Sequence, residues 1–345
     1  MSVPGPAGAA QRAPGARRRS PLWPVLGGLV ATLLVASLLI GPAPVPPAAA
    51  LHALLGQGDP VLVAVMQQVR LPRTVLGLLV GASLGLTGAA LQGFLRNPLA
   101  EPGLIGTSSA AALGAVLAIQ TGLAAAVPMA LPGMGLLGAA VAVALMIGLA
   151  GPRGGTLVLI LAGIAVSAIA SAGTALVLNL SPNPFAANEI VFWMMGSLAD
   201  RSWVHVAMTA PFMAVGTLML AGCARGLRAL SLGEDAAAAM GVDLARLRIL
   251  LIGGVAALTG SATAVAGAIG FVGLVVPHLV RRHVGADPAR VMWASALGGA
   301  VVVLAADIAV RVILPGRDLK LGVLTALIGT PFFLHLILSA RGDRE

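Results

Sequence analysis

The sequence is poor in charged and aromatic residues. Asp, Glu, Lys and Arg together make up 10% of the 345 residues, Phe and Trp make up 3%, and Tyr is absent. Soluble globular proteins carry about a quarter charged residues, so a water-soluble domain is excluded. Membrane β-barrels need aromatic girdles and alternating strands, whereas the apolar runs here are continuous. The composition therefore predicts an all-α, polytopic membrane protein.

Cysteine and lysine each occur once. Cys223 has no second thiol with which to form an internal disulfide or share a metal ion. Lys320 follows a leucine, whereas a phosphate-binding loop needs the order Gly-Lys-Ser/Thr. The chain therefore carries no Walker A site, and any ATP that it uses must be bound by a partner subunit.

No set of side chains for catalysis or metal binding emerges from the sequence. The five histidines are dispersed, without the spacing of metal ligands. No Ser/His/Asp set and no paired aspartate-rich motif is present, which disfavours an integral-membrane enzyme. We expect no catalytic residue and no metal site.

Hydrophobic residues make up 58% of the chain, and the mean hydropathy is +0.99. A helix needs about 20 apolar residues to cross the hydrocarbon core. The apolar runs predict one membrane domain over 22–340 with about ten spans. The expected spans are 22–41, 71–92, 103–120, 127–150, 155–178, 203–222, 249–266, 268–282, 291–312 and 319–339.

The two ends of the chain are expected to be cytoplasmic tails. Residues 1–21 are rich in Pro, Gly, Ala and Arg and are predicted to be disordered, and 341–345 form a short tail. The run 22–40, followed by three alanines at 48–50, could also be a signal peptide with its cleavage site. Its apolar core is longer than usual for a signal peptide, which favours an uncleaved first span.

Residues 249–280 form one uncharged run, too long for one crossing and short for two. The clusters 225–248 and 281–290 that flank it are both basic, so both are expected in the cytoplasm. An even number of passes must then separate them. This favours two short helices, with an uncertain boundary between them.

Basic residues set the orientation of the ten spans. With the N-terminus inside, fifteen of the 21 basic residues fall on the inner side, which satisfies the positive-inside rule. The six outer ones are Arg70, Arg73, Arg201, Arg311, Arg317 and Lys320. Both termini are therefore predicted in the cytoplasm. The net charge of +9 could indicate nucleic-acid binding, but these residues are scattered between apolar runs, and we expect no nucleic-acid partner.

Acidic residues are almost confined to predicted loops. Only Asp307 lies well inside a span, and Arg311 follows one helical turn later, which predicts a neutralised pair. A proton- or sodium-coupled carrier would show more carboxylates within the membrane. A secondary transporter is therefore the weaker alternative.

Small residues form stripes on two predicted spans. Gly77, Gly81 and Gly85 recur every four residues and predict close packing of helices. Four small or hydroxyl residues share one face of the fifth span: Gly163, Ser167, Ser171 and Thr174. These hydroxyls either bond back to their own helix or form a weakly polar wall for a bulky cargo.

The largest inner loop, 223–248, contains a short predicted helix. Ser231 is expected as its N-cap, with Glu234 completing a capping box, and Gly241 as its C-terminal stop. Such a helix between two spans is either a docking element for a cytoplasmic partner or a helix lying on the bilayer surface.

Five segments together resemble one family. They are 70–73 (RLPR), 97–103 (NPLAEPG), 192–198 (FWMMGSL), 267–278 (GAIGFVGLVVPH) and 322–333 (GVLTALIGTPFF). They occur in the right order from about residue 60 to the end. The chain thereby resembles the FecCD family, permeases of binding-protein-dependent ABC importers for ferric siderophores, haem and vitamin B12.

The resemblance implies a type II ABC importer fold with ten spans per subunit. It implies a homodimer in the lipid of a bacterial inner membrane, with the pathway along the dimer axis. Two cytoplasmic ABC ATPase subunits would hold ATP and Mg, so this chain itself would bind no cofactor. A periplasmic binding protein would deliver the cargo.

The same resemblance implies roles for particular residues. Residues 231–241 match the coupling helix that docks on the ATPase, here Ser231, Leu232, Gly233, Glu234, Asp235, Ala238 and Gly241. Arg70, Arg73 and Arg311 match arginines that meet glutamates of the binding protein, although Asp307 competes for Arg311. The fifth-span stripe matches the pathway wall, and Asn97, Gly155 and Thr156 lie in loops near the inner gate.

The cargo is the least determined property. A ferric siderophore is the first expectation, with cobalamin and haem as alternatives. Residues 181–185 differ from haem-type permeases, which lowers haem without excluding it.

Overall fold

The apolar runs fold into helices, and a computed structural model describes residues 21–41, 44–127, 129–151, 156–285, 287–313 and 319–342. No strand occurs among these residues. The all-α prediction is confirmed. Of the predicted tails 1–21 and 341–345, residues 1–20 and 343–345 lie outside the described residues, and α15 continues to Gly342.

The helices follow one another without interruption by other regular structure. They are α1 Leu22–Leu39, α2 Pro47–Leu54, α3 Pro60–Ala64, the π-helix η1 Val65–Arg70, α4 Leu71–Leu95, the 3-10 helix η2 Pro102–Ile105, α5 Thr107–Gln120, α6 Leu123–Ala126, α7 Ala130–Ala150, α8 Thr156–Asn179, α9 Pro184–Met194, α10 Trp203–Leu230, α11 Glu234–Ala239, α12 Leu244–Ala266, α13 Val272–Val284, α14 Pro288–Ile313 and α15 Leu321–Gly342.

Ten of these helical stretches match the ten predicted spans. Seven are long and apolar enough to cross a membrane, and two shorter apolar helices are Thr107–Gln120 and Leu321–His335. The tenth, α13, has 13 residues and carries Arg281, Arg282 and His283 in its last turn.

Several helices extend beyond the predicted spans. The second span begins at Pro60, and α10 ends at Leu230 rather than at residue 222. Hydropathy detects only the apolar part of a helix, whereas the backbone hydrogen bonds of the helix continue beyond the hydrocarbon core. The sequence did not predict the short helix α9, whose first turn is capped by the Asn183 side chain on Phe185 N–H at 3.0 Å.

The uncharged run 249–280 is divided into two helices, as predicted. Residues 267–271 separate α12 from α13, with Gly267 at φ +69° and Phe271 at φ +66°. The Ala266 carbonyl accepts a hydrogen bond from Ser197 N–H at 2.8 Å, so the segment that follows α9 contacts the chain next to this break. The second helix begins at Val272 rather than at 268, because these residues leave the helical conformation.

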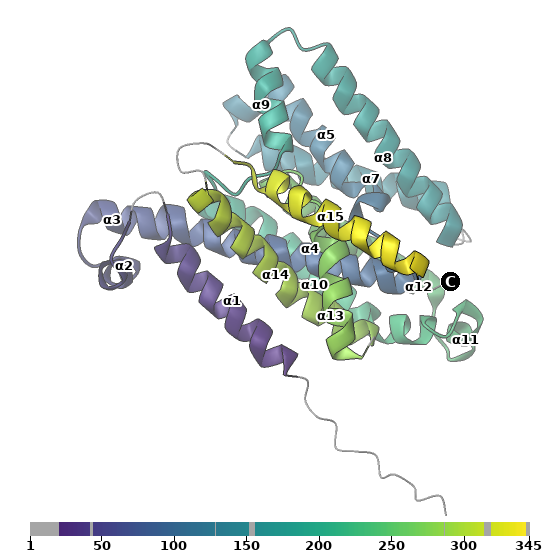
Figure 1. Cartoon of the computed structure of the whole chain (residues 1–345). Helices are drawn as coiled ribbons and strands as arrows, with labels where there is room; N and C mark the ends of the chain where they lie inside the picture. Colours follow the sequence, from purple (N-terminus) through teal and green to yellow (C-terminus); the bar gives the residue numbers. More distant parts are fainter. Residues whose placement is uncertain are drawn as a thin grey trace, which may run out of the picture.

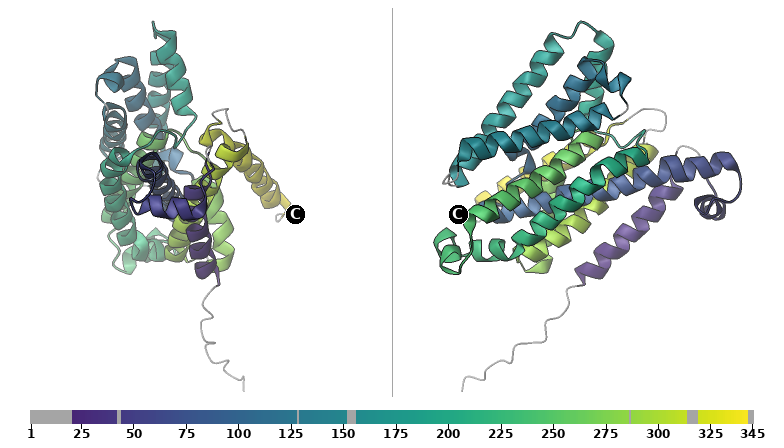
Figure 2. Two further views of the ribbon diagram at one scale, coloured as in Figure 1. Left: turned by 90° about the vertical axis from the view of Figure 1, so that its left-hand side faces the viewer. Right: turned by 180° about the vertical axis from the view of Figure 1, so that it is seen from behind.

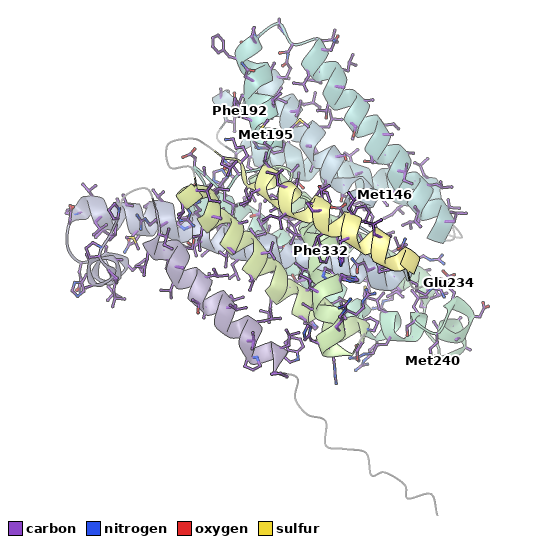
Figure 3. The ribbon with its side chains drawn as sticks, viewed as in Figure 1. Met146, Phe192, Met195, Glu234, Met240 and Phe332 are labelled. Atoms are coloured by element: carbon purple, nitrogen blue, oxygen red, sulfur yellow. The ribbon has the colours of Figure 1, made fainter. Side chains whose placement is uncertain are left out.

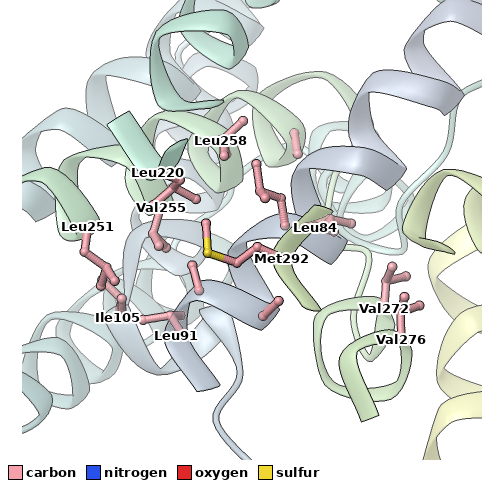
Figure 4. Close-up of a cluster of buried hydrophobic side chains, with 14 of the residues drawn as sticks. Leu84, Leu91, Ile105, Leu220, Leu251, Val255, Leu258, Val272, Val276 and Met292 are labelled. Carbon is pink, nitrogen blue, oxygen red and sulfur yellow. The ribbon is translucent and has the colours of Figure 1, made fainter. Parts of the chain in front are cut away.

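The helices form two stacked groups (Figures 1 and 2). One group holds α5, α7, α8 and α9, and the other is built around α4, α10, α12, α13 and α14, with α1 outside it. Helix α11 and the C-terminal end of α15 lie at one end of the bundle, and α2, α3 and α9 lie toward the other. Figure 4 shows the apolar side chains that fill the region around α4, among them Leu84, Leu91 and Met292.

Helix α4 packs against α14 through backbone contact. A Cβ atom at Gly81 would overlap the Gly299 carbonyl of α14, and one at Gly85 would overlap the Ser295 carbonyl. Gly88 faces Gly273 of α13 in the same way. Small residues permit this approach where lipid offers no hydrophobic driving force between helices. The glycine stripe thus has the close-packing role that the sequence predicts.

Substituting Gly85 by Ala is expected to destabilise the fold. An inserted methyl group must displace the α14 backbone, and overpacking of this kind costs about 1–3 kcal/mol. Gly93→Ala, on the same helix, meets its nearest neighbour at 3.7 Å and is the matched control. Because alanine favours a helix over glycine by about 1 kcal/mol, this control is expected to be neutral or stabilising. Thermal unfolding in detergent tests this, and equal midpoints for both variants would contradict it.

Candidate functional site

The end of the bundle that the basic residues predict to face outward, called the outer end below, holds a buried ionic cluster around Asp307. Arg311 Nη2 lies 2.7 Å from Asp307 Oδ2, and Arg73 Nη2 lies 2.8 Å from Asp307 Oδ1. The Asp307 side chain is 1% exposed. The predicted pair of Asp307 with Arg311 is therefore present, and Arg73 joins it from α4. One carboxylate holds two guanidinium groups from different helices.

Two arginines of this region also cap the end of α1. Arg70 Nη1 donates to the carbonyls of Leu38 at 2.8 Å and Leu39 at 2.9 Å. Arg311 Nη1 donates to the carbonyls of Ser37 at 2.9 Å and Ile40 at 2.8 Å. The last carbonyls of a helix have no partner within it, and cations are favourable there.

Hydroxyl groups complete the attachment of α1. Ser37 Oγ accepts from Arg311 Nη2 at 2.7 Å and lies 2.9 Å from the Thr74 hydroxyl. The first helix is thus bound to α4 and α14 through polar groups, and its being an uncleaved span stays a prediction.

The three arginines predicted to meet a binding protein all lie here. Arg70 is 6% exposed, the Arg311 side chain is 6% exposed, and the Arg73 side chain is 19% exposed. Each already has partners within the chain. Arg73 is the most accessible of them, and the docking role of all three stays a prediction.

The short inner helix α11 begins differently from the prediction. Ser231 directly follows α10, and its hydroxyl donates to the Arg228 carbonyl at 2.6 Å. The N-cap is Gly233, at φ +114°, so the predicted capping box is wrong. The reason is that α10 continues to Leu230 and uses Ser231 at its own end. The Glu234 carboxylate instead pairs with Arg248 of α12 at 3.4 Å.

The end of α11 agrees with the sequence. Gly241 has φ +80°, its N–H donates to the Ala238 carbonyl at 2.9 Å, and Val242 N–H donates to the Ala237 carbonyl at 3.0 Å. These two bonds form a Schellman motif. Gly241 therefore ends the helix as predicted.

Helix α11 is fixed at its base and exposed at its surface. Ala237 is fully buried against the core, whereas Leu232 and Met240 are 69% and 64% exposed. Figure 3 shows Glu234 and Met240 at the end of the bundle that carries this helix. A short helix that is fixed at its base and has exposed apolar side chains is suited to contact a protein partner.

Polar contacts that sequence reasoning missed join the inner ends of four helices. Arg228 of α10 lies 3.0 Å from Asp287, which precedes α14. Burial opposes ionisation of Asp287, but hydrogen bonds from Arg228 and from the N–H groups of Arg290 and Ala289, with the attraction to Arg228, hold its pKa below the usual range.

A second inner contact centres on the buried amide of Gln92 in α4. Its oxygen accepts from Arg281 Nη2 at 3.0 Å, and its nitrogen donates to the Gly273 carbonyl at 3.3 Å. Glu101 Oε1 accepts from Phe271 N–H at 3.1 Å. Helix α13 is thus bound to α4 and to the loop that follows it.

The predicted gate residues are only partly described. Asn97 Oδ1 accepts from Leu99 N–H at 2.9 Å and fixes the turn after α4. Thr156 is the first residue of α8, and Gly155 lies outside the described residues. A cavity of about 130 Å³ lies beyond this turn, between Glu101, Ser108, Thr263 and the backbone of 267–271. Gate function of these loops stays a prediction.

The small-residue face of α8 is mostly packed inside the chain. Ser167 Oγ lies 3.0 Å from the Ser109 hydroxyl of α5, and Gly163 is buried against Gly106. The Thr174 hydroxyl donates back to the Ala170 carbonyl at 3.0 Å, as the alternative interpretation expected. Only Ser171 is exposed. A pathway role for this face stays a prediction.

Comparison with protein families gives one match that covers most of the chain. The model of the FecCD transport family matches residues 29–339. The segments that carried the resemblance from residue 70 onward all lie within this range.

Similar proteins are permeases with different named cargoes. A cobalamin import system permease of Halobacterium salinarum is 41% identical, over 80% of this chain and 73% of its own. An Fe(3+)-citrate import system permease of Bacillus subtilis (strain 168) is 37% identical, over 91% of this chain and 93% of its own. The solved structure of an ABC transporter described as of the metal-chelate type, in an inward-facing conformation, superposes with a TM-score of 0.81 at 35% identity, over 92% of this chain and 98% of that one.

Removing the carboxylate of Asp307 is expected to destabilise the outer end strongly. Asp307→Ala leaves Arg73 and Arg311 without a counter-charge in a buried place, and breaking a buried pair in this way costs about 3–5 kcal/mol. Asp287→Ala is the milder control. Its partner Arg228 has a side chain that is 49% exposed, so the ion pair contributes about 0–1 kcal/mol, and the lost hydrogen bonds to the Ala289 and Arg290 N–H groups cost about 1 kcal/mol. Thermal unfolding in detergent measures both, and similar losses would contradict the assignment.

Proposed function

This chain belongs to the FecCD transport family and is the permease of an ABC importer, and we propose that it carries an iron chelate into the cytoplasm of a bacterium. Membership implies that it works with an ATPase and a binding protein. The near-complete superposition on an ABC transporter and the type II importer fold are the observations that carry this conclusion.

The chain's own residues support the proposal that separate subunits bind ATP. With a single lysine outside any phosphate-binding motif, the chain holds no Walker A site, and we assign ATP and Mg to two separate cytoplasmic subunits. Helix α11 would receive their movement, because its exposed apolar residues stand on a base tied to α12 by Glu234 and Arg248.

The proposed orientation places α11 and both termini in the cytoplasm. Helix α11 and the C-terminal end of α15 share one end of the bundle (Figure 1), and the basic residues of α10, α12 and α13 gather near that end. The positive-inside rule favours that side for the cytoplasm. The binding protein would then meet the opposite end, near Arg73.

The transport pathway is proposed to lie between two copies of this chain. Helix α8 has a largely exposed apolar side, including Leu161, Ile164 and Ile169, beside the exposed Ser171. A second protomer would cover such a face, and Ser171 would then lie near the shared axis.

An iron chelate is the favoured cargo. The iron-citrate permease aligns over nearly its whole length, and the matching solved structure is described as of the metal-chelate type. Cobalamin is the second candidate, because its permease in Halobacterium salinarum is 41% identical to this chain. Haem is the third, since the family resemblance extends to it.

Reconstitution tests the function directly. The chain, its ATPase and its binding protein would be placed in liposomes, and ATP-dependent accumulation of a ferric siderophore, cobalamin and haem would be compared. Accumulation of the iron chelate that stops without ATP is expected. Uptake of cobalamin or haem alone would change the cargo only, and uptake that ignores ATP and follows a proton gradient would contradict the importer assignment.

Changing the exposed surface of α11 is expected to uncouple the transporter. In Leu232→Asp/Asp235→Lys the fold should persist, because both side chains are exposed. ATP-dependent uptake should fall by about tenfold or more, since interfacial coupling of this kind spans about 5- to 150-fold. Glu189→Lys, an exposed charge reversal on α9, is the matched control. Retained uptake with normal ATPase co-purification in the α11 variant would remove the docking assignment.

A further inference from the structure

Helices α10 and α14 both pack on α4 but leave a hollow between them. This hollow, called the upper hollow, measures about 560 Å³. It is lined by residues between 79 and 86 of α4, by residues between 210 and 218 of α10, and by Trp293 and Ala296 of α14. Its only hydroxyls are those of Ser83 and Thr217, and the latter donates back to the Met213 carbonyl at 2.7 Å. This surface offers hydrocarbon contact and almost no hydrogen bonding.

A second hollow, called the lower hollow, lies further along α4 and α14 and is lined by basic residues. It measures about 260 Å³ and is lined by Ala89, Gln92, Gly93 and Arg96 of α4, with Arg281 of α13 and Ser231 after α10. No carboxylate lines it. The two hollows differ in chemical character although α4 and α14 line both.

The positive charge of the lower hollow is not balanced within the described chain. Arg96 makes no hydrogen bond or ion pair with the described residues, and Arg281 donates only to the neutral Gln92 oxygen at 3.0 Å. The nearest carboxylate in sequence to the lining residue Pro288 is Asp287, which is already bound to Arg228. The hollow is therefore complementary to an anion.

The two hollows lie end to end. Leu86 in the upper one and Ala89 in the lower one are about 4.5 Å apart along the α4 axis. The rise from Leu79 to Arg96 is about 25 Å. Half of a bilayer, with its headgroups, measures about 20–22 Å. The combined length thus matches one leaflet, with the arginines at headgroup depth.

We propose that this groove binds an anionic phospholipid of the cytoplasmic leaflet. Arg96 and Arg281 hold its phosphate, and its acyl chain lies along the upper hollow between α10 and α14. Basic pockets between membrane helices on this side are suited to lipid headgroups. The assignment of the leaflet rests on the proposed orientation, whereas the lipid preference is independent of transport and cargo.

The test uses the full chain, purified in detergent and stripped of lipid. The thermal midpoint would be followed during titration with phosphatidylglycerol and, separately, phosphatidylcholine. Half-saturation by phosphatidylglycerol is expected at a concentration about fivefold or more below that needed for phosphatidylcholine. Arg96→Ala and Arg281→Gln should lose this preference. Arg282→Ala, an exposed arginine beside Arg281 but outside the hollow, should keep it.

A second variant tests the acyl part. Ala214 is exposed and lines the upper hollow, so Ala214→Trp should fill it without disturbing the core. This variant should bind both lipids more weakly while keeping the unliganded midpoint. Unchanged lipid binding would overturn the placement of the acyl chain.

Four results would overturn the proposal. These are equal binding of the two lipids, an equal loss of preference in Arg282→Ala, full stabilisation by inorganic phosphate alone, and displacement of the lipid by the ATPase subunit. The third would indicate a site for soluble phosphate, and the fourth a contact with an acidic side chain of the partner. If Arg281→Gln fails to fold, the exposed Arg96→Ala decides the question.

Discussion

Close contact between the backbones of α4 and α14 fixes both polar ends of the molecule. Gly81 and Gly85 allow this contact, and Gly88 allows the equivalent approach of α13. Because a helix is stiff, the register set at these glycines also places Arg73 opposite Asp307 at the outer end. The same register brings Gln92 to Arg281 at the inner end. A shift at the glycines would therefore disturb both polar ends together.

The few charges of the chain serve mainly to hold helix ends. At the outer end, two arginines satisfy the last carbonyls of α1, and the same cluster is the predicted docking place of a binding protein. A binding protein that docks there would contact guanidinium groups that already bind the carbonyls of α1. Docking would therefore weaken or alter the attachment of α1. At the inner end, Glu234 ties α11 to Arg248 of α12, α12 packs against α4, and Gln92 of α4 binds Arg281 of α13 shortly before the turn at Asn97. Movement imposed on α11 therefore has physical contacts through which to reach the turn.

Features that depend on local sequence were predictable. Long apolar runs indicated the helices, the glycine stripe indicated close packing, and Gly241 indicated the end of α11. Contacts between distant residues were not predictable: Arg73 and Asp307 are 234 positions apart, and Gln92 and Arg281 are 189 apart. Ser231 shows how a local pattern misleads: the residues fit a capping box, but Ser231 is the C-cap of the preceding helix α10. The hydroxyl stripe of α8 shares one helix face as expected, but its periodicity does not reveal which neighbours cover that face.

Coupling to ATP hydrolysis, as proposed, depends on α11 receiving the ATPase. Hydrogen–deuterium exchange of the chain, alone and in complex with its ATPase, tests this most directly, because exchange reports protection residue by residue. The account predicts that complex formation slows exchange in 231–241 and leaves α2 and α9, toward the opposite end, unchanged. Protection that appears at α2 and α9 while 231–241 exchange as before would contradict it.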